Sequence, residues 1–172
     1  MNKFVVVLIA LGVPFSAYCQ VQMTINQKWK RVDTAHSTSR YESFWLLACT
    51  IEFKKKKTDQ SLFLEKLLIS WKGAQLEHLH GTLYKKPLEK EFLPFQEHLL
   101  CESSWNRQKQ QIIFRFQHPL ALEAETTLCL VLSVPQKLES TIRTGYFEFE
   151  RNTFPKTLQG SLAHKKLIFA YR

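Results

Sequence analysis

The chain has 172 residues, 24 of them Lys or Arg and 15 of them Asp or Glu, which gives a formal net charge of +9. It is 45% hydrophobic and 13% aromatic, so it is too apolar for an intrinsically disordered protein. Five Gly and six Pro exclude collagen-like and low-complexity chains, and four Cys are too few for a disulfide-dense scaffold. A chain of this length normally forms one core, so we expect a single basic domain.

The N-terminus is typical of a secretory signal peptide. Lys3 supplies a short positive region, and residues 4–11 are uninterruptedly apolar. Ala17 and Cys19 are small residues at the −3 and −1 positions for cleavage before Gln20. The apolar stretch is shorter than the roughly 20 residues that a transmembrane helix needs. A buried first strand is the alternative interpretation of this segment.

These features predict a signal peptide over residues 1–19 and one mature domain over residues 20–172. The expected location is therefore extracytoplasmic, either periplasmic or secreted. A minor alternative is a lipid anchor on Cys19, but Tyr18 stands where a lipoprotein signal has a small residue.

Short apolar segments follow, separated by polar turns at intervals typical of an all-β protein. In chain order, we expect strands near residues 21–25, 41–53, 62–71, 78–84, 96–101, 111–117, 126–134, 141–150 and 167–171. Residues 33–40 and 103–109 are the clearest loop segments between them. The segment 126–134 is apolar on both faces, which predicts a central strand.

Residues 62–71 are the most ambiguous segment, because their leucines also satisfy helical spacing. We favour a strand, since Ile69-Ser70-Trp71 leads directly into the turn Lys72-Gly73. Two other boundaries follow from proline: His118-Pro119 should end the strand 111–117, and Pro135 should end the strand 126–134.

No long amphipathic helix alternates with these segments, which argues against a parallel sheet of βαβ units. The pattern instead predicts two stacked antiparallel sheets, an Ig-like or jelly-roll β-sandwich. A closed β-barrel is the alternative architecture.

Three cysteines remain after the signal peptide, so at most one intramolecular disulfide can form. Strict alternation places Cys49 on the same face as Trp45 and Leu47. Cys129 lies between two leucines, so both Cys49 and Cys129 look like small core residues. We favour buried, unpaired thiols. A Cys49–Cys129 bridge requires that their two faces meet, and the role of Cys101 is open.

The sequence contains no catalytic motif, and we expect no enzymatic activity and no cofactor. His78 and His80 have the His-x-His spacing of metal sites, but no further ligand is evident, so two ordinary histidines are the simpler interpretation. The alternative is a secreted hydrolase whose site is assembled from dispersed histidines, with His98 as the third member.

Basic residues are the remaining signal. Lys54, Lys55, Lys56 and Lys57 form a run after an aromatic strand, and Trp105 lies beside Arg107 near an expected turn. If the loops that carry these basic residues lie together at one end of the fold, they would form a patch that binds an anionic polymer or a membrane surface. Lysines at strand ends also prevent edge-to-edge aggregation, which accounts for most of these positions without any ligand.

We therefore expect an exported, non-enzymatic binding or surface-interaction module. Its partner is an unidentified protein or surface, or alternatively an anionic polymer or membrane bound by the Lys-rich loop. No motif specific for nucleic acid is present.

Overall fold

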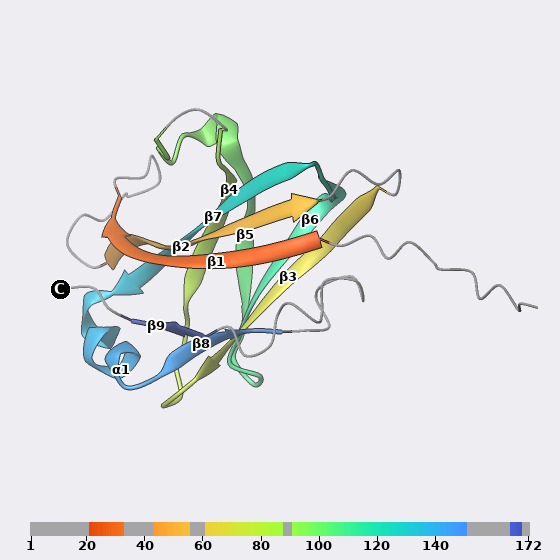
Figure 1. Ribbon diagram of the computed structural model, residues 1–172. Coiled ribbons are helices and arrows are strands. Elements are labelled where there is room, and N and C mark those ends of the chain that lie inside the picture. The colour runs from red at the N-terminus through yellow and green to blue at the C-terminus, as the bar shows by residue number, and fades with distance from the viewer. Residues whose placement is uncertain (1–20, 33–42, 56–60, 88–90, 151–165, 170–172) are drawn as a thin grey trace, which may run out of the picture.

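The computed structural model describes residues 21–32, 43–55, 61–87, 91–150 and 166–169. Within these ranges the chain forms nine strands and three short helices (Figure 1). The strands are β1 (Val21–Arg31), β2 (Ser43–Lys55), β3 (Leu62–Lys72), β4 (His80–Lys85), β5 (Leu99–Asn106), β6 (Gln111–Leu122), β7 (Glu125–Pro135), β8 (Tyr146–Phe149) and β9 (Lys166–Ile168). The helices are η1 (Gln96–His98), η2 (Gln136–Leu138) and α1 (Glu139–Arg143).

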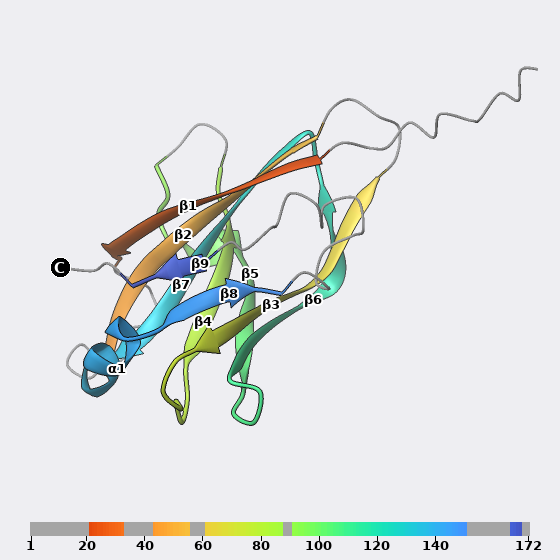
Figure 2. The ribbon, with the colours of Figure 1, turned by 60° about the horizontal axis from the view of Figure 1, so that its bottom comes forward.

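The strands join in one antiparallel sheet with the order β1-β2-β7-β4-β5-β6-β3-β8-β9. Strand β5 pairs with β4 on one side and with β6 on the other, so the two halves of the sheet are continuous. The sheet curls until its first and last strands approach each other (Figures 1 and 2). There Gln27 Nε2 donates a hydrogen bond to the main-chain oxygen of Lys166 at 3.1 Å. The prediction of an antiparallel all-β fold is confirmed, and this nearly closed sheet corresponds to the barrel alternative.

The inner face of the curled sheet encloses the interior core. This core receives at least one side chain from every strand, because alternate residues of each strand point inward. Its fully buried members include Leu46, Ile51, Leu67, Phe114, Leu130 and Phe147. A second, smaller apolar cluster lies outside this core.

A bulge at Ala48 changes which side chains of β2 point inward. Leu47 pairs with Val131 and Cys49 with Leu130, so Ala48 is an extra residue opposite β7. Before the bulge, Leu47 belongs to the second cluster; after it, Cys49 belongs to the interior core. The prediction that Cys49 shares a face with Trp45 and Leu47 is therefore wrong, because one inserted residue inverts the alternation.

A second irregularity places Trp29 between the two ends of the sheet. The register of β1 shifts between Gln27 and Lys30, and Trp29 adopts a positive φ of 45°. Its buried ring contacts Phe169 with centroids 4.9 Å apart and Phe147 with centroids 6.3 Å apart. Trp29 thus fills the space where β1 and β9 meet without a backbone ladder in the described part of the chain.

The prediction of a strand over residues 62–71 is confirmed by β3, and 126–134 is indeed central, as β7 lies between β2 and β4. Three other expectations are wrong. Residues 103–106, expected in a loop, belong to β5, because they pair with residues 111–114 of β6, and the turn begins only at Arg107. Strand β6 continues through Pro119 to Leu122, because Pro119 falls where the pairing with β3 is interrupted and no ladder hydrogen bond is required of it. The segment 141–150 begins within α1 and becomes a strand only at Tyr146.

Candidate functional site

The second apolar cluster lies on the outer face of the sheet, and we call it the outer-face cluster. Its buried members are Leu47, Tyr84, Phe92, Cys129 and Val131. They come from the central strands β2, β4 and β7 and from the segment 91–95, which covers these strands. Tyr84 and Phe92 pack edge to face with centroids 5.5 Å apart. The outward-facing residues of β7 are therefore apolar because the segment 91–95 buries them.

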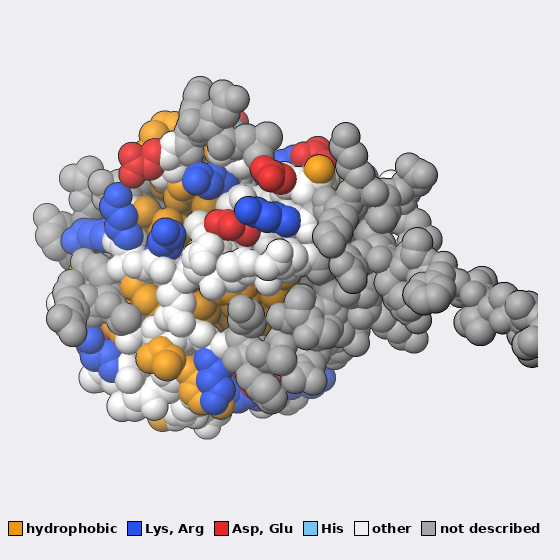
Figure 3. Space-filling view, in the orientation of Figure 1, with side chains coloured by type: hydrophobic (Ala, Val, Ile, Leu, Met, Phe, Trp, Pro, Cys, Tyr) orange, Lys and Arg blue, Asp and Glu red, His pale blue; other side chains and the backbone are white. Residues whose placement is uncertain are grey.

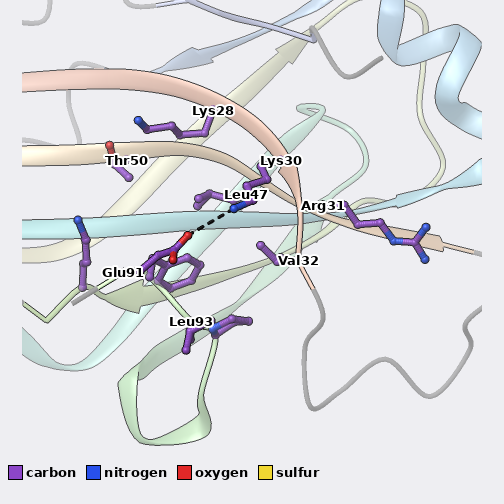
Figure 4. Close-up of a pocket in the computed structure, with 11 residues that line it drawn as sticks. Lys28, Lys30, Arg31, Val32, Leu47, Thr50, Glu91 and Leu93 are labelled. Carbon is purple, nitrogen blue, oxygen red and sulfur yellow. Dashed lines mark hydrogen bonds and ion pairs between the residues drawn. The ribbon is translucent and has the colours of Figure 1, made fainter.

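A pocket opens beside this cluster (Figure 4), with a volume of about 460 Å³. We call it the outer-face pocket. Its apolar lining consists of Val32, Leu47, Phe92, Leu93 and Pro94. Thr50 adds a hydroxyl group to the wall. The volume lies within the range of small-molecule binding sites.

Cationic side chains surround the outer-face pocket. Lys28, Lys30, Arg31 and Lys86 line it, against the single carboxylate of Glu91. Lys30 Nζ lies 3.4 Å from Glu91 Oε1, and both side chains are well exposed, so this ion pair contributes little to stability. The guanidinium of Arg31 lies over the ring of Phe44, 5.6 Å from its centroid. Three of the four cations thus have no carboxylate partner among the described residues.

Figure 3 shows this arrangement on the surface, where blue cationic side chains gather around exposed apolar side chains on the upper left of the molecule. The cations come from two separate elements: the end of β1 carries Lys28, Lys30 and Arg31, and Lys86 follows β4. Because alternate residues of a strand share a face, Lys28 and Lys30 point outward with Val32. The site is therefore basic at its rim and apolar at its floor.

Two smaller hollows adjoin the outer-face pocket through Lys86. One, of about 340 Å³, is lined by Lys85, His98, Leu99 and Glu123 among others. The other, of about 180 Å³, is lined by Glu52, Lys54, Glu125 and Thr127 among others. Lys86 and Pro87 line both of these hollows. Lys86 alone lines all three, so it is the common element of this face.

The structure brings Lys54 to this face but separates it from the other predicted anion-site residues. Lys54 pairs with Glu125 beside the Lys85 end of β4, whereas Arg107 follows β5 beyond the His80 end. Lys54 and Arg107 are both exposed. For Lys55 the backbone alone is described, and Lys56 and Lys57 lie outside the described residues.

Two tryptophans that stood near expected turns are not exposed. Trp105 is half-buried and packs against the interior core, and its indole N–H is buried with no hydrogen-bond partner among the described residues. Trp71 is buried, and its indole N–H donates to the Ala74 carbonyl at 2.7 Å. Burial thus removes the Trp71 ring from ligand contact, and packing on the core covers part of the Trp105 ring.

The three histidines of the hydrolase hypothesis do not converge. His80 begins β4 and lies edge-on to Trp45, with centroids 5.6 Å apart, while His78 is exposed in the preceding loop. His98 lies beyond the other end of β4, where its Nε2 is 3.3 Å from Glu97 Oε1. No group of three potential metal ligands occurs among the His, Cys, Asp and Glu residues that the structure describes.

The three described cysteines are unpaired thiols. Burial raises the pKa of Cys101 and of Cys129 to about 12. Burial also raises the pKa of Cys49, and the nearby thiol of Cys129 raises it further. A thiol with such a pKa stays protonated at neutral pH, and the thiolate is the nucleophilic form. The prediction of small, buried core residues is confirmed for Cys49 and Cys129.

The residues that line the outer-face pocket did not stand out in the sequence. Lys28, Lys30 and Arg31 alternate along an ordinary strand, and Lys86 is one lysine of a pair. The available signal was the apolar outer face of residues 126–134, which requires a cover. The segment E-F-L-P-F at residues 91–95 supplies that cover, although nothing in its sequence names the strands beneath it.

No protein-family model matches the chain, and no curated protein matches it. Among the described residues, no helix has the length and apolar composition needed to span a membrane.

Proposed function

We propose that the protein is an exported, non-enzymatic binding module whose ligand is an amphipathic anion, a molecule with an apolar body and one negatively charged group. The observation that carries this proposal is the coincidence of an apolar floor and an uncompensated cationic rim in one pocket of about 460 Å³. Export rests on the signal-like segment of residues 1–19, which lies outside the described residues.

The two parts of the outer-face pocket select different parts of such a ligand. Contact with Leu47, Phe92 and Leu93 removes apolar surface from water, which contributes roughly 25 cal/mol per Å². Lys28 and Lys86 favour a negative charge at the opening, and they attract anions from solution. The guanidinium of Arg31 points away from the opening, over Phe44, and adds only to the basic surroundings (Figure 4). A purely apolar ligand would make no use of the cations at the rim. An inorganic anion would make no use of the apolar floor of the pocket.

Binding rather than catalysis is supported by the state of the reactive side chains. The thiols of Cys101 and Cys129 have a pKa of about 12, and the histidines of the hydrolase hypothesis lie at opposite ends of β4. The outer-face pocket itself contains no histidine or cysteine among its lining residues.

The test is a calorimetric titration of the full chain with laurate and with dodecanol, its neutral counterpart. We expect saturable binding of laurate and weaker binding of dodecanol. Lys28→Ser and Lys86→Ser should each weaken laurate binding about fivefold at low salt, which corresponds to about 1 kcal/mol. Lys109→Ser, a change of an exposed lysine outside the pocket, is the matched control and should leave binding unchanged. Equal affinity for laurate and dodecanol would contradict the proposal.

A second candidate function is the binding of an anionic polymer through the run from Lys54 to Lys57. It is supported by one observation: Lys54 lines a hollow that also includes Lys86, so the start of the run adjoins the basic rim of the outer-face pocket.

A further inference from the structure

We infer that the rim of the outer-face pocket docks on an anionic lipid bilayer, with Leu93 and Phe95 inserted at the lipid interface. This inference rests on the proposed function and deepens it, because it names the bilayer as the source of the amphipathic ligand. Three observations carry it: two exposed apolar side chains, the rigid attachment of their segment, and the sign of the surrounding charge.

Two of the four exposed large apolar side chains of the described residues lie in one short segment. Leu93 and Phe95 are 52% and 53% exposed, whereas Phe92, which precedes them, and Pro94, which lies between them, are buried. The chain therefore alternates, with one face turned to the protein and the other to solvent. Single exposed apolar residues are common on soluble proteins, but two on the same side of one segment form a continuous tip.

The segment is held firmly to the sheet beneath it. Phe92 packs on Tyr84, and the main-chain N–H of Phe95 donates to the Leu93 carbonyl at 2.8 Å. The N–H of His98 in turn donates to the Phe95 carbonyl at 3.1 Å. This backbone geometry already turns Leu93 and Phe95 to solvent, so their insertion requires no change of the local fold, which lowers its entropic cost.

The cations beside this tip complement an anionic bilayer. Leu93 lines the same pocket as Lys28 and Lys86, which have no carboxylate partner in the described chain. The segment itself is flanked by two exposed carboxylates, and of these Glu91 is paired with Lys30 and Glu97 lies beside His98. Basic residues beside exposed apolar residues are typical of proteins that lie on membrane surfaces. There, insertion of the apolar side chains and electrostatic attraction to anionic lipids both contribute to binding. An acidic protein partner would use the cations but would give two projecting apolar side chains no apolar environment to enter.

The geometry also connects docking with binding. Leu93 belongs both to the exposed tip and to the pocket lining, so the mouth of the outer-face pocket lies at the surface that would contact the bilayer. A lipid-derived anion could then enter the pocket without exposing its apolar body to bulk water.

The experiment is co-sedimentation of the full chain with vesicles of phosphatidylcholine, alone or mixed with phosphatidylglycerol. We expect binding to the mixed vesicles only, and its loss at high salt. Phe95→Ser should lower the partition coefficient at least tenfold. Phe63→Ser is the matched control, because Phe63 is 51% exposed but lies on β3, outside the site, and it should leave the partition coefficient unchanged. Both variants should unfold in urea as the unmodified chain does.

The outcomes separate this inference from the proposed function. Phe95 does not line the pocket, so Phe95→Ser should retain laurate binding while losing the vesicles. Laurate binding without vesicle binding would overturn the inference and leave the proposed function standing. Vesicle binding that distinguishes Phe95→Ser from Phe63→Ser, without laurate binding, would support the docking surface and overturn the pocket function. Equal vesicle binding by all variants would mean that charge alone causes the binding, and it would overturn the inference. Retention of the chain on poly-glutamate that equals its retention on the mixed vesicles would have the same meaning.

Discussion

Cys49 and Cys129 lie on neighbouring strands but face opposite sides of the sheet. Cys49 points into the interior core, whereas Cys129 belongs to the outer-face cluster. A disulfide requires the two Cβ atoms to approach each other, and the sheet itself separates these two thiols. The bulge at Ala48 creates this relationship, because it places Cys49 on the inner face.

We therefore predict that Cys49 and Cys129 do not form a disulfide, even under oxidising conditions. Non-reducing peptide mapping should recover both as free thiols. Both should react slowly with iodoacetamide in the native protein and rapidly in urea, because burial in the folded state restricts access. A cross-linked Cys49–Cys129 peptide would contradict the placement of the bulge.

Stability should decrease at alkaline pH. Burial raises the pKa of Cys129 from 9.0 to about 12, so on unfolding this thiol regains its ordinary pKa. Its contribution to stability is fully present below pH 9 and is lost as the pH rises toward 12, because the unfolded state releases its proton first. Urea unfolding at increasing pH should show a smaller decrease for Cys129→Ala than for the unmodified chain. Identical slopes would mean that the thiol is not buried in this way.

Removal of the Trp29 ring should weaken the junction between β1 and β9. Trp29→Ala deletes a buried ring that contacts Phe147 and Phe169, and such changes typically cost about 3–5 kcal/mol of the free energy of unfolding. Trp29→Phe should cost less, because it keeps an aromatic ring and removes an indole N–H that has no partner in the described residues. Urea unfolding measures both variants, and an equal loss for the two would contradict the packing role of the ring.

Deletion of Ala48 should remove the bulge without changing which side chains of β2 point inward. Leu47 and Cys49 would become consecutive and would still face Val131 and Leu130, so the variant should fold, with a lower free energy of unfolding because the buried Ala48 side chain is lost. Ala48→Gly keeps the bulge and should show a modest loss of stability. Circular dichroism and thermal unfolding measure both variants, and a deletion variant that does not fold would contradict the assignment of Ala48 as the extra residue.

Replacement of Lys54, Lys55, Lys56 and Lys57 by Ser tests the second candidate function. If this run binds an anionic polymer, the variant should elute earlier from heparin, and the difference should disappear at high salt. Lys28→Ser with Lys86→Ser provides the comparison at the outer-face pocket. Unchanged elution of the four-lysine variant would contradict polymer binding, and protection against aggregation would then account for these lysines without a ligand.

The strand content of the fold was predictable from the sequence, because period-two alternation marks most strands, although Pro119 does not end β6 as expected. The segment 62–71 was correctly assigned through its turn at Lys72-Gly73, and the two-sided apolar pattern of 126–134 correctly indicated a central strand. The closure of the sheet was not predictable, since it depends on β5 pairing with both β4 and β6. Alternation within one segment carries no information about the number of its neighbours.

The site was harder to predict than the fold for a related reason. Lys28 and Lys86 are far apart in the sequence and meet only because β1, β2, β7 and β4 are successive neighbours in the sheet. The run from Lys54 to Lys57 is conspicuous in the sequence because its members are adjacent. Of these four, the structure describes the side chain of Lys54 alone.

The pairing of β2 with β7 has a consequence for how the chain folds. Ser43 pairs with Pro135 and Lys54 with Glu125, so β3, β4, β5 and β6 all lie between these partners in the sequence. Loop closure must precede this pairing, which places the protein among slowly folding topologies. During synthesis, the apolar strand β2 emerges long before its central partner exists. Until β7 is made, the edge of β2 that does not pair with β1 stays unpaired and open to aggregation.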